Sequence, residues 1–231
     1  IKSSAASDVY KRQLLLSILL LGGLATPAFA EGQATSKGDI TFTEPTNTVE
    51  PLNPTDPSKP VEPADPENPA TGQTGPLTLD VVPELPFGTH EIESGTKTYQ
   101  VDASKNDTPY LQVSDRRGVG ADGQAQGWNV TVSVSDFVNG SQVLQGAELD
   151  FGTSTVKSTS DNESTGPTSQ TVTGLSKASA ATPIFTAAKD QGLGTWLSVY
   201  DPANITLKVP KAAAGTFTAD LTWNLVAGPV A

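Results

Sequence analysis

Apolar and polar side chains alternate strictly near the end of the chain. Threonine, aspartate or asparagine separates each of the apolar residues Phe217, Ala219, Leu221, Trp223 and Leu225. A two-residue period sustained over about ten residues is typical of a β-strand with one buried face. Shorter runs of the same kind occur at 77–81, 110–113, 128–134 and 205–209. The pattern predicts an all-β fold, an antiparallel sandwich or barrel-like domain with long loops.

The predicted β domain covers residues 77–231 and is preceded by a proline-rich segment. Residues 45–76 contain nine of the 18 prolines, and a proline recurs at every third position from Pro51 to Pro69. Polyproline II has three residues per turn, so we expect an acidic, extended arm that acts as a linker. An alternative is that this arm is a ligand for an aromatic groove.

Ahead of the arm, residues 31–44 form a short segment with a strand signal of its own. Ile40 and Phe42 alternate with polar residues in Asp39–Thr43. A strand separated from the main domain needs a neighbour to complete its hydrogen bonds. It would pair either with the sheet of its own domain or with another chain, and the sequence leaves both open.

The first thirty residues have the layout of a secretory signal peptide. Lys11 and Arg12 precede an apolar run of about 11 residues, and Ala28–Ala30 supplies the small-residue cleavage signal. A membrane-spanning helix needs roughly 20 residues. We therefore expect a secreted, extracellular protein whose mature chain has no membrane span. Residues 1–13 do not resemble a positively charged leader start and need not be native.

Composition and charge exclude several classes of function. The chain has 14 basic and 25 acidic residues, a net charge of −11. Residues 1–30 carry +2, so removing them would leave −11 − 2 = −13. Such a chain is too acidic to bind nucleic acid by neutralising phosphates. The absence of cysteine and the single histidine, His90, exclude thiolate metal sites and disulfides, and we expect no metal and no cofactor.

Three catalytic or cofactor motifs match only by chance. Residues 118–123 fit the dinucleotide pattern G-x-G-x-x-G, but no helix follows, so we interpret them as a hairpin loop. S-x-x-K at 154–157 and S-D-N at 160–162 lie in one polar loop and cannot face each other across a cleft. His90 has no nucleophile elbow elsewhere in the chain to serve. The sequence therefore predicts a protein that is not an enzyme.

Two tryptophan-containing strands stand out from this background. The sequence resembles the WxL-domain surface proteins of low-GC Gram-positive bacteria, whose distal motif is an aromatic residue, three spacers, an aliphatic residue, Thr-Trp-x-Leu and then a proline. The matching positions are Trp128, Val130, Phe217, Leu221, Thr222, Trp223, Leu225 and Pro229. Val130 stands where the family has leucine. Segments 113–118 and 194–196 match as well, and the resemblance extends over residues 31–231.

The resemblance implies a non-catalytic, secreted protein held non-covalently on cell-wall peptidoglycan by its C-terminal domain, in company with other surface proteins. The alternative is a structural subunit that docks a partner through its N-terminal strand or proline-rich arm. A charge near −13 is repelled by anionic wall polymers, so attachment would rest on stacking, hydrogen bonds or cation bridging. Alternation places Trp128 and Trp223 on apolar faces, where they are either core residues or sugar platforms. Trp196 is another candidate for exposure.

Overall fold

The structure is a computed structural model that describes residues 34–229. The predicted signal peptide, residues 1–30, lies outside the described residues. The chain divides into two units between Phe42 and Thr43. In the first unit, residues 34–42 carry no assigned strand or helix, and the side chains of Ile40 and Phe42 are 78% and 85% exposed. The strand predicted at Asp39–Thr43 is therefore unpaired in the structure.

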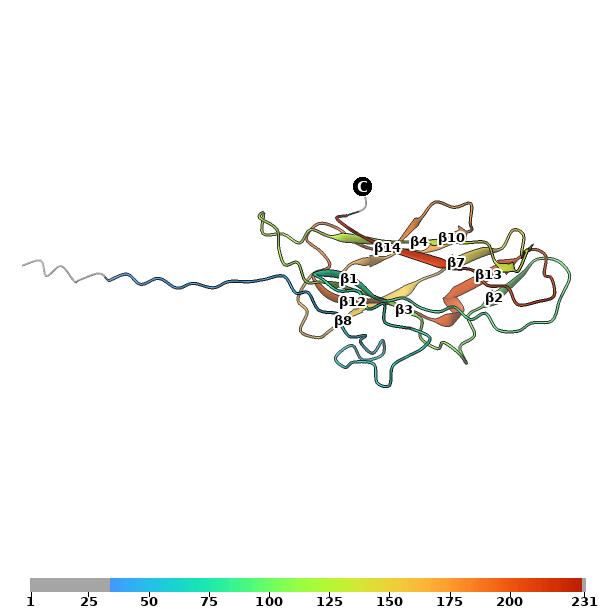
Figure 1. The fold of residues 1–231 in the computed structure, drawn as a ribbon, viewed down its shortest axis with the longest axis horizontal. Coiled ribbons are helices and arrows are strands. Elements are labelled where there is room, and N and C mark those ends of the chain that lie inside the picture. Colours follow the sequence, from blue (N-terminus) through green and yellow to red (C-terminus); the bar gives the residue numbers. More distant parts are fainter. Residues whose placement is uncertain (1–33, 230–231) are drawn as a thin grey trace, which may run out of the picture. The chain divides into compact units, whose positions relative to one another are not determined.

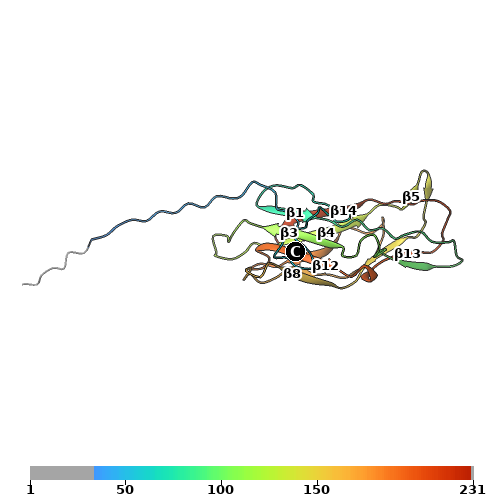
Figure 2. The ribbon, with the colours of Figure 1, turned by 90° about the horizontal axis from the view of Figure 1, so that it is seen from below.

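The second unit is built of antiparallel sheets, as the alternation predicts (Figure 1). The first sheet has the order β1 (Leu77–Val81), β3 (Tyr110–Asp115), β12 (Gly194–Tyr200), β8 (Ser154–Ser158). The second has the order β10 (Val172–Leu175), β7 (Glu148–Phe151), β13 (Ile205–Val209), β2 (Lys97–Gln100). The third has the order β14 (Leu221–Ala227), β4 (Trp128–Val134), β11 (Thr182–Ala187), β9 (Thr168–Ser169). A hairpin of β5 (Val138–Asn139) and β6 (Gln142–Val143) projects from the unit (Figure 2), and the 3₁₀ turn η1 (Pro202–Asn204) precedes β13.

The three sheets share one apolar core, and Phe151 of β7 connects them. Its ring contacts Tyr200 of β12 edge to face, with centroids 5.9 Å apart. It contacts Trp223 of β14 in the same way at 5.8 Å. Trp128 and Phe185 form a further edge-to-face pair at 5.0 Å between the neighbouring strands β4 and β11. Aromatic pairs with this geometry add to the stabilisation that burial alone provides.

The proline-rich segment differs from the extended arm that its period predicts. The side chain of Asn53 accepts hydrogen bonds from the main-chain N–H groups of Thr55 and Asp56, which turns the chain. The strand-like bridge between Leu52 and Pro60 then closes a hairpin-like loop. Asparagine and aspartate side chains favour such turns because their oxygens bond to the main chain two or three residues further on. The proline period is therefore interrupted by turn residues at the positions between the prolines.

This proline-rich segment packs onto the first sheet. Gln112 of β3 accepts a hydrogen bond from the Leu52 N–H and donates one to the Glu50 carbonyl, at 2.7 and 3.0 Å. Asn68 is 2% exposed and its amide donates to the Asn106 side chain. Leu52 also packs against a second, smaller apolar cluster that includes Tyr110. As a result, β3 is buried on both faces and does not show the polar alternation of a half-exposed strand.

Two other local predictions need correction. The last strand starts at Leu221 rather than at residue 216, and Thr218 instead bridges to Val138. Residues 118–123 form a loop without a helix, but they do not close a hairpin. They connect β3 of the first sheet to β4 of the third, two strands that are not neighbours.

Candidate functional site

The two tryptophan motifs lie on neighbouring strands. β4 and β14 pair antiparallel in continuous register, with Leu225 opposite Val130 and Trp223 opposite Val132 (Figure 1). We call this pair of strands the motif ribbon. Residues 87 to 99 positions apart in sequence thus form one structural unit, whose two faces carry the two halves of the alternation.

Trp128 lies on the inner face of the motif ribbon, at the end where β4 begins. Its side chain is fully buried, and its indole N–H donates to the Gly192 carbonyl at 3.0 Å. Gly127 and Gly192 both have positive φ, +71° and +80°. A Cβ on Gly192 would lie 2.5 Å from the indole nitrogen, and one on Gly127 would lie 2.5 Å from the Ala187 carbonyl. Glycine at position 192 leaves room for the indole, and glycine at position 127 leaves room for the main chain of Ala187.

The distal motif is less deeply buried than the proximal one. Val130 is fully buried beside Trp128. In contrast, Phe217, Leu221, Trp223 and Leu225 are half-buried and pack against the core, while Thr222 and Pro229 are exposed. Trp196, expected as a candidate for exposure, is only 8% exposed, and its indole N–H donates to the Leu193 carbonyl at 2.8 Å. Of the three tryptophans, Trp223 is thus the one with substantial contact with solvent.

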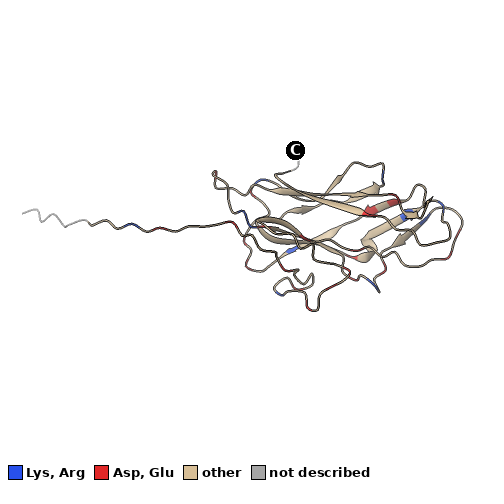
Figure 3. Ribbon diagram, viewed as in Figure 1, with Lys and Arg blue, Asp and Glu red and all other residues tan. Residues whose placement is uncertain are grey.

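The outer face of the motif ribbon is polar and uncharged. It carries the exposed residues Thr222, Asn224 and Val226 of β14 and the half-buried residues Asn129, Thr131 and Ser133 of β4. Neither strand contains a lysine, arginine, aspartate or glutamate (Figure 3). This face was not among the predicted sites, although the same alternation that predicts the core also identifies its members. The hydroxyl and amide groups give it donors and acceptors without a net field.

A small cavity of about 250 Å³ lies where the motif ribbon ends at Pro229. The other residues that line it are Asp122, Gln124, Ala125, Gln126 and Lys189. Lys189 donates to Asp122 at 2.6 Å and holds the pKa of that carboxyl below its usual value. The pair leaves the cavity without net charge, and the two glutamine side chains add amide donors and acceptors.

The other segments that carry the family resemblance converge on the same end of the motif ribbon. Arg117 forms an ion pair with Asp115 at 2.7 Å and also donates to the Gly127 carbonyl at 2.8 Å. Asp115 lies opposite Gly194 in the pairing of β3 with β12. The Gly228 N–H donates to the same Gly127 carbonyl. Segments 113–118 and 194–196 therefore position the turn that leads into Trp128.

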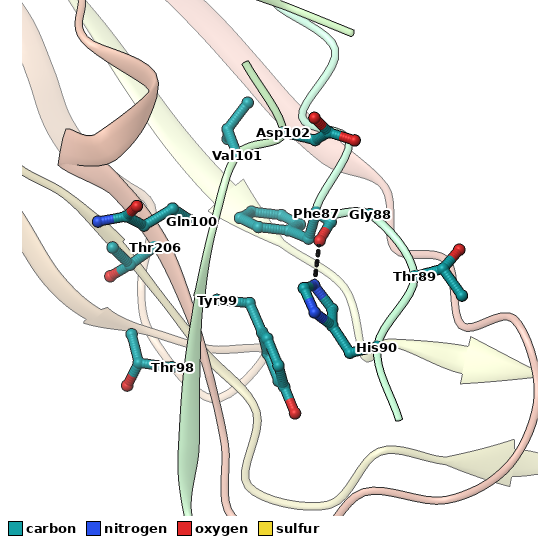
Figure 4. Close-up of a pocket in the computed structure, with 10 residues that line it drawn as sticks. All are labelled: Phe87, Gly88, Thr89, His90, Thr98, Tyr99, Gln100, Val101, Asp102 and Thr206. Carbon is teal, nitrogen blue, oxygen red and sulfur yellow. Dashed lines mark hydrogen bonds between the residues drawn. The ribbon is translucent and has the colours of Figure 1, made fainter. Parts of the chain in front are cut away.

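A larger cavity of about 590 Å³ surrounds His90 in another part of the unit (Figure 4). The His90 ring stacks on Tyr99 with centroids 4.2 Å apart, and its Nε2 donates to the Phe87 carbonyl at 2.6 Å. Asp102 lines the cavity too, and hydrogen bonds from Ser104 hold the pKa of its carboxyl below the usual value. The aliphatic hydroxyl groups among the lining residues belong to Thr89, Thr98 and Thr206, whereas the hydrogen bond of the His90 ring goes to the Phe87 carbonyl. Histidine thus contacts a carbonyl here, not the nucleophile that acyl transfer requires.

Comparison with known proteins agrees with this geometry. The profile of one family, described as WxL domain surface cell wall-binding, matches residues 30–229. Neither the curated proteins nor the solved structures contain a match. Within residues 34–229, no helix has the length and hydrophobicity needed to cross a bilayer. Since the match covers most of the sequence and includes both strands of the motif ribbon, the chain belongs to the WxL family of cell-surface proteins, whose domain binds the cell wall.

Proposed function

We propose that the chain is a secreted, non-catalytic protein of the Gram-positive surface that attaches to peptidoglycan without a covalent bond. The contact surface is the outer face of the motif ribbon together with the cavity at Pro229. The observation that carries this proposal is that the motif ribbon presents an uncharged hydroxyl and amide face on a chain with a net charge of −11.

Charge is the reason to favour this face. Acidic residues elsewhere on the chain repel anionic wall polymers, and the repulsion decreases where a surface lacks charge. Glycan strands of peptidoglycan offer hydroxyl and acetamido groups, which hydrogen-bond to threonine, serine and asparagine side chains. Thr222 and Asn224 are exposed and stand on a paired strand, so little main-chain freedom is lost on binding.

In this proposal, the motif tryptophans act as supports. Trp128 is fully buried and has no surface to offer a polymer. Trp223 packs its ring on Phe151 and so fixes the position of Thr222 and Asn224 on the opposite side of the same strand. The motif tryptophans thereby determine the shape of the contact surface from the inner side of the motif ribbon.

Pelleting with acid-stripped sacculi tests the proposal. We expect the wild-type chain to sediment with the sacculi and the T222A/N224A variant to remain largely in the supernatant. T98A/T206A is the matched control, because these two residues stand on β2 and β13, away from the motif ribbon. Equal retention of both variants would reject the outer face as the contact surface. Failure of the wild-type chain to sediment would reject peptidoglycan as the polymer.

A structural role is the second candidate, and the exposure of Ile40 and Phe42 favours it. In that case, the chain would be retained on sacculi only after a partner protein is added. An activity screen on wall fragments completes the comparison, since release of soluble sugars or peptides by the pure protein would contradict a non-catalytic role.

A further inference from the structure

The outermost strand of the third sheet, β14, has one edge without a hydrogen-bonded neighbour, and β1 of the first sheet approaches this strand. It pairs with β4 on one side, and in the described part of the chain no other main-chain hydrogen bond reaches residues 221–227. The strand is seven residues long, has no proline and no charge, and its register is free of bulges. Natural sheets usually protect such edges, because the unpaired N–H and C=O groups form a template for another strand.

The other described sheet edges all carry a protective feature. β1 has a bulge and is bridged by Ala70, and β10 has an irregular register. β8 and β2 include Lys157 and Lys97, and β9 is only two residues long. Of these edges, β14 alone combines length, neutrality and regularity. This contrast indicates that the edge of β14 is kept available.

The apolar side chains of β14 also lack a full cover. Leu221, Trp223 and Leu225 point toward the core but remain half-buried, whereas their neighbours Val130 and Val132 on β4 are fully buried. The difference arises because β4 has a strand on each side and β14 has only one. A further strand beside β14 would cover these three side chains, provided that it brought apolar groups at every second position.

Asp39–Thr43 has the required pattern. Ile40 and Phe42 are almost completely exposed, and polar residues alternate with them. If Ile40 lies beside Trp223 in parallel register, Phe42 lies beside Leu225 on the apolar face. Thr41 then lies beside Asn224 on the outer face of the motif ribbon. The same register brings Lys37 beside Asp220, so opposite charges meet at the start of the pair.

We infer that Asp39–Thr43 of one chain adds as a strand to the free edge of β14 in a second copy. Charge is compatible with this pairing, because Asp39 is the single charge in the donor segment and residues 221–227 carry none, whereas most other surfaces of a chain at −11 repel each other. Each chain has one donor segment and one acceptor edge. Association therefore proceeds to a closed dimer or to longer chains. This inference concerns self-association and does not depend on which polymer holds the protein on the wall.

Cross-linking tests the register directly, because the chain contains no cysteine. T41C and N224C, prepared separately and mixed under mild oxidation, should form a disulfide between two chains. T41C mixed with T206C is the matched control and should give little product. A disulfide that forms only inside a single T41C/N224C chain would overturn the inference, since the segment would then pair with its own domain. No disulfide in either arrangement would overturn it as well.

Light scattering measures the association without a cross-link. The mass of the wild-type chain should rise with concentration to at least twice the monomer value, and I40S/F42S should remain monomeric. The control T41S/T43S changes the alternate positions and should associate like the wild type. A wild-type chain that stays monomeric at every concentration would contradict the inference. If monomeric I40S/F42S is still retained on sacculi, wall binding does not require self-association, and the two proposals are tested independently.

Discussion

Trp223 meets Phe151 edge to face, with ring centroids 5.8 Å apart and an angle of 76° between the rings. The two residues belong to different sheets, so this contact joins the edge strand β14 to the second sheet. Phe151 is fully buried, and Trp223 is half-buried. The distal motif is therefore attached to the core through a tryptophan that also faces solvent.

We expect W223A to lower the free energy of unfolding by about 2 kcal/mol, less than the 3–5 kcal/mol typical of a fully buried tryptophan. Retention on sacculi should be lost, because β14 loses its contact with Phe151 and the outer face loses its support. Chemical denaturation and pelleting measure the two effects. W223F keeps an aromatic ring near Phe151 and should bind. A folded W223A variant that binds normally would show that the indole neither supports nor contacts the wall.

Gly192→Ala should destabilise the protein by about 3 kcal/mol or more. The new Cβ would lie 2.5 Å from the Trp128 indole nitrogen, and φ is +80°, so overpacking adds to backbone strain. Gly174→Ala is the matched control, because its φ is +65° but nothing lies within 4 Å of the added carbon. That variant should cost about 1 kcal/mol, the contribution of the backbone alone. Equal losses in thermal or urea unfolding would show that the indole yields to the methyl group.

The sequence predicts those strands of the fold that have one buried face and one solvent-exposed face. Strands β4 and β13 alternate because one side of each is more accessible to solvent, and both were located correctly. β3 was recognised only in part, since Gln112 and Ser114 are buried, Gln112 against the proline-rich segment, and both resemble surface residues in the sequence. The extended arm was predicted from the spacing of the prolines alone, without regard to the residues between them. Asn53 and Asn68, which turn and anchor that segment, act through contacts that composition does not reveal.

Candidate site residues were predictable to a similar degree. Trp223 and Val130 follow from the motif and its alternation, including the side of the strand on which they lie. The pairing of β4 with β14 is a long-range contact, and the turn at Gly127 is held by Arg117, which lies ten residues earlier beyond a loop. Neither has a local signal, so the outer face of the motif ribbon and the cavity at Pro229 emerged only when these strands were seen together.

Removing Arg117 should be costly, because it would leave a charge without its partner. The Asp115 side chain is fully buried and that of Arg117 is 9% exposed. R117A should lower the free energy of unfolding by about 3 kcal/mol, the usual cost of breaking a buried pair from one side. K97A breaks the ion pair of Lys97 with Glu93, two side chains that are 37% and 58% exposed. It should lower the free energy of unfolding by less than about 1 kcal/mol. Similar losses from the two variants would contradict the buried character of the Arg117 pair.

Asp80 should make the protein less stable as pH rises. Burial raises the pKa of this carboxyl above its ordinary value, even though Ser114, Thr78 and Gln112 donate hydrogen bonds to it. The folded state therefore holds its proton at a pH where the unfolded state, near the ordinary pKa of about 3.9, has released it. Where the folded state binds more protons, stability falls with rising pH. Asp80→Asn removes this titration and keeps an acceptor and a donor, so it should gain stability relative to the wild type as pH rises above about 4.

Asp102→Asn provides the control of opposite sign. Hydrogen bonds from Ser104 lower the pKa of the Asp102 carboxyl, so its contribution is present above the unfolded pKa and is lost as pH falls through the folded value. Relative to the wild type, this variant should lose stability as pH rises toward the ordinary pKa of about 3.9 and change little above it, whereas Asp80→Asn gains stability above that value. Urea unfolding at a series of pH values measures both differences. Both substitutions remove one negative charge from the same protein. A general effect of charge removal would therefore change the stability of both variants in the same direction as pH rises. Slopes of equal sign would therefore mean that the burial of Asp80 does not control its proton.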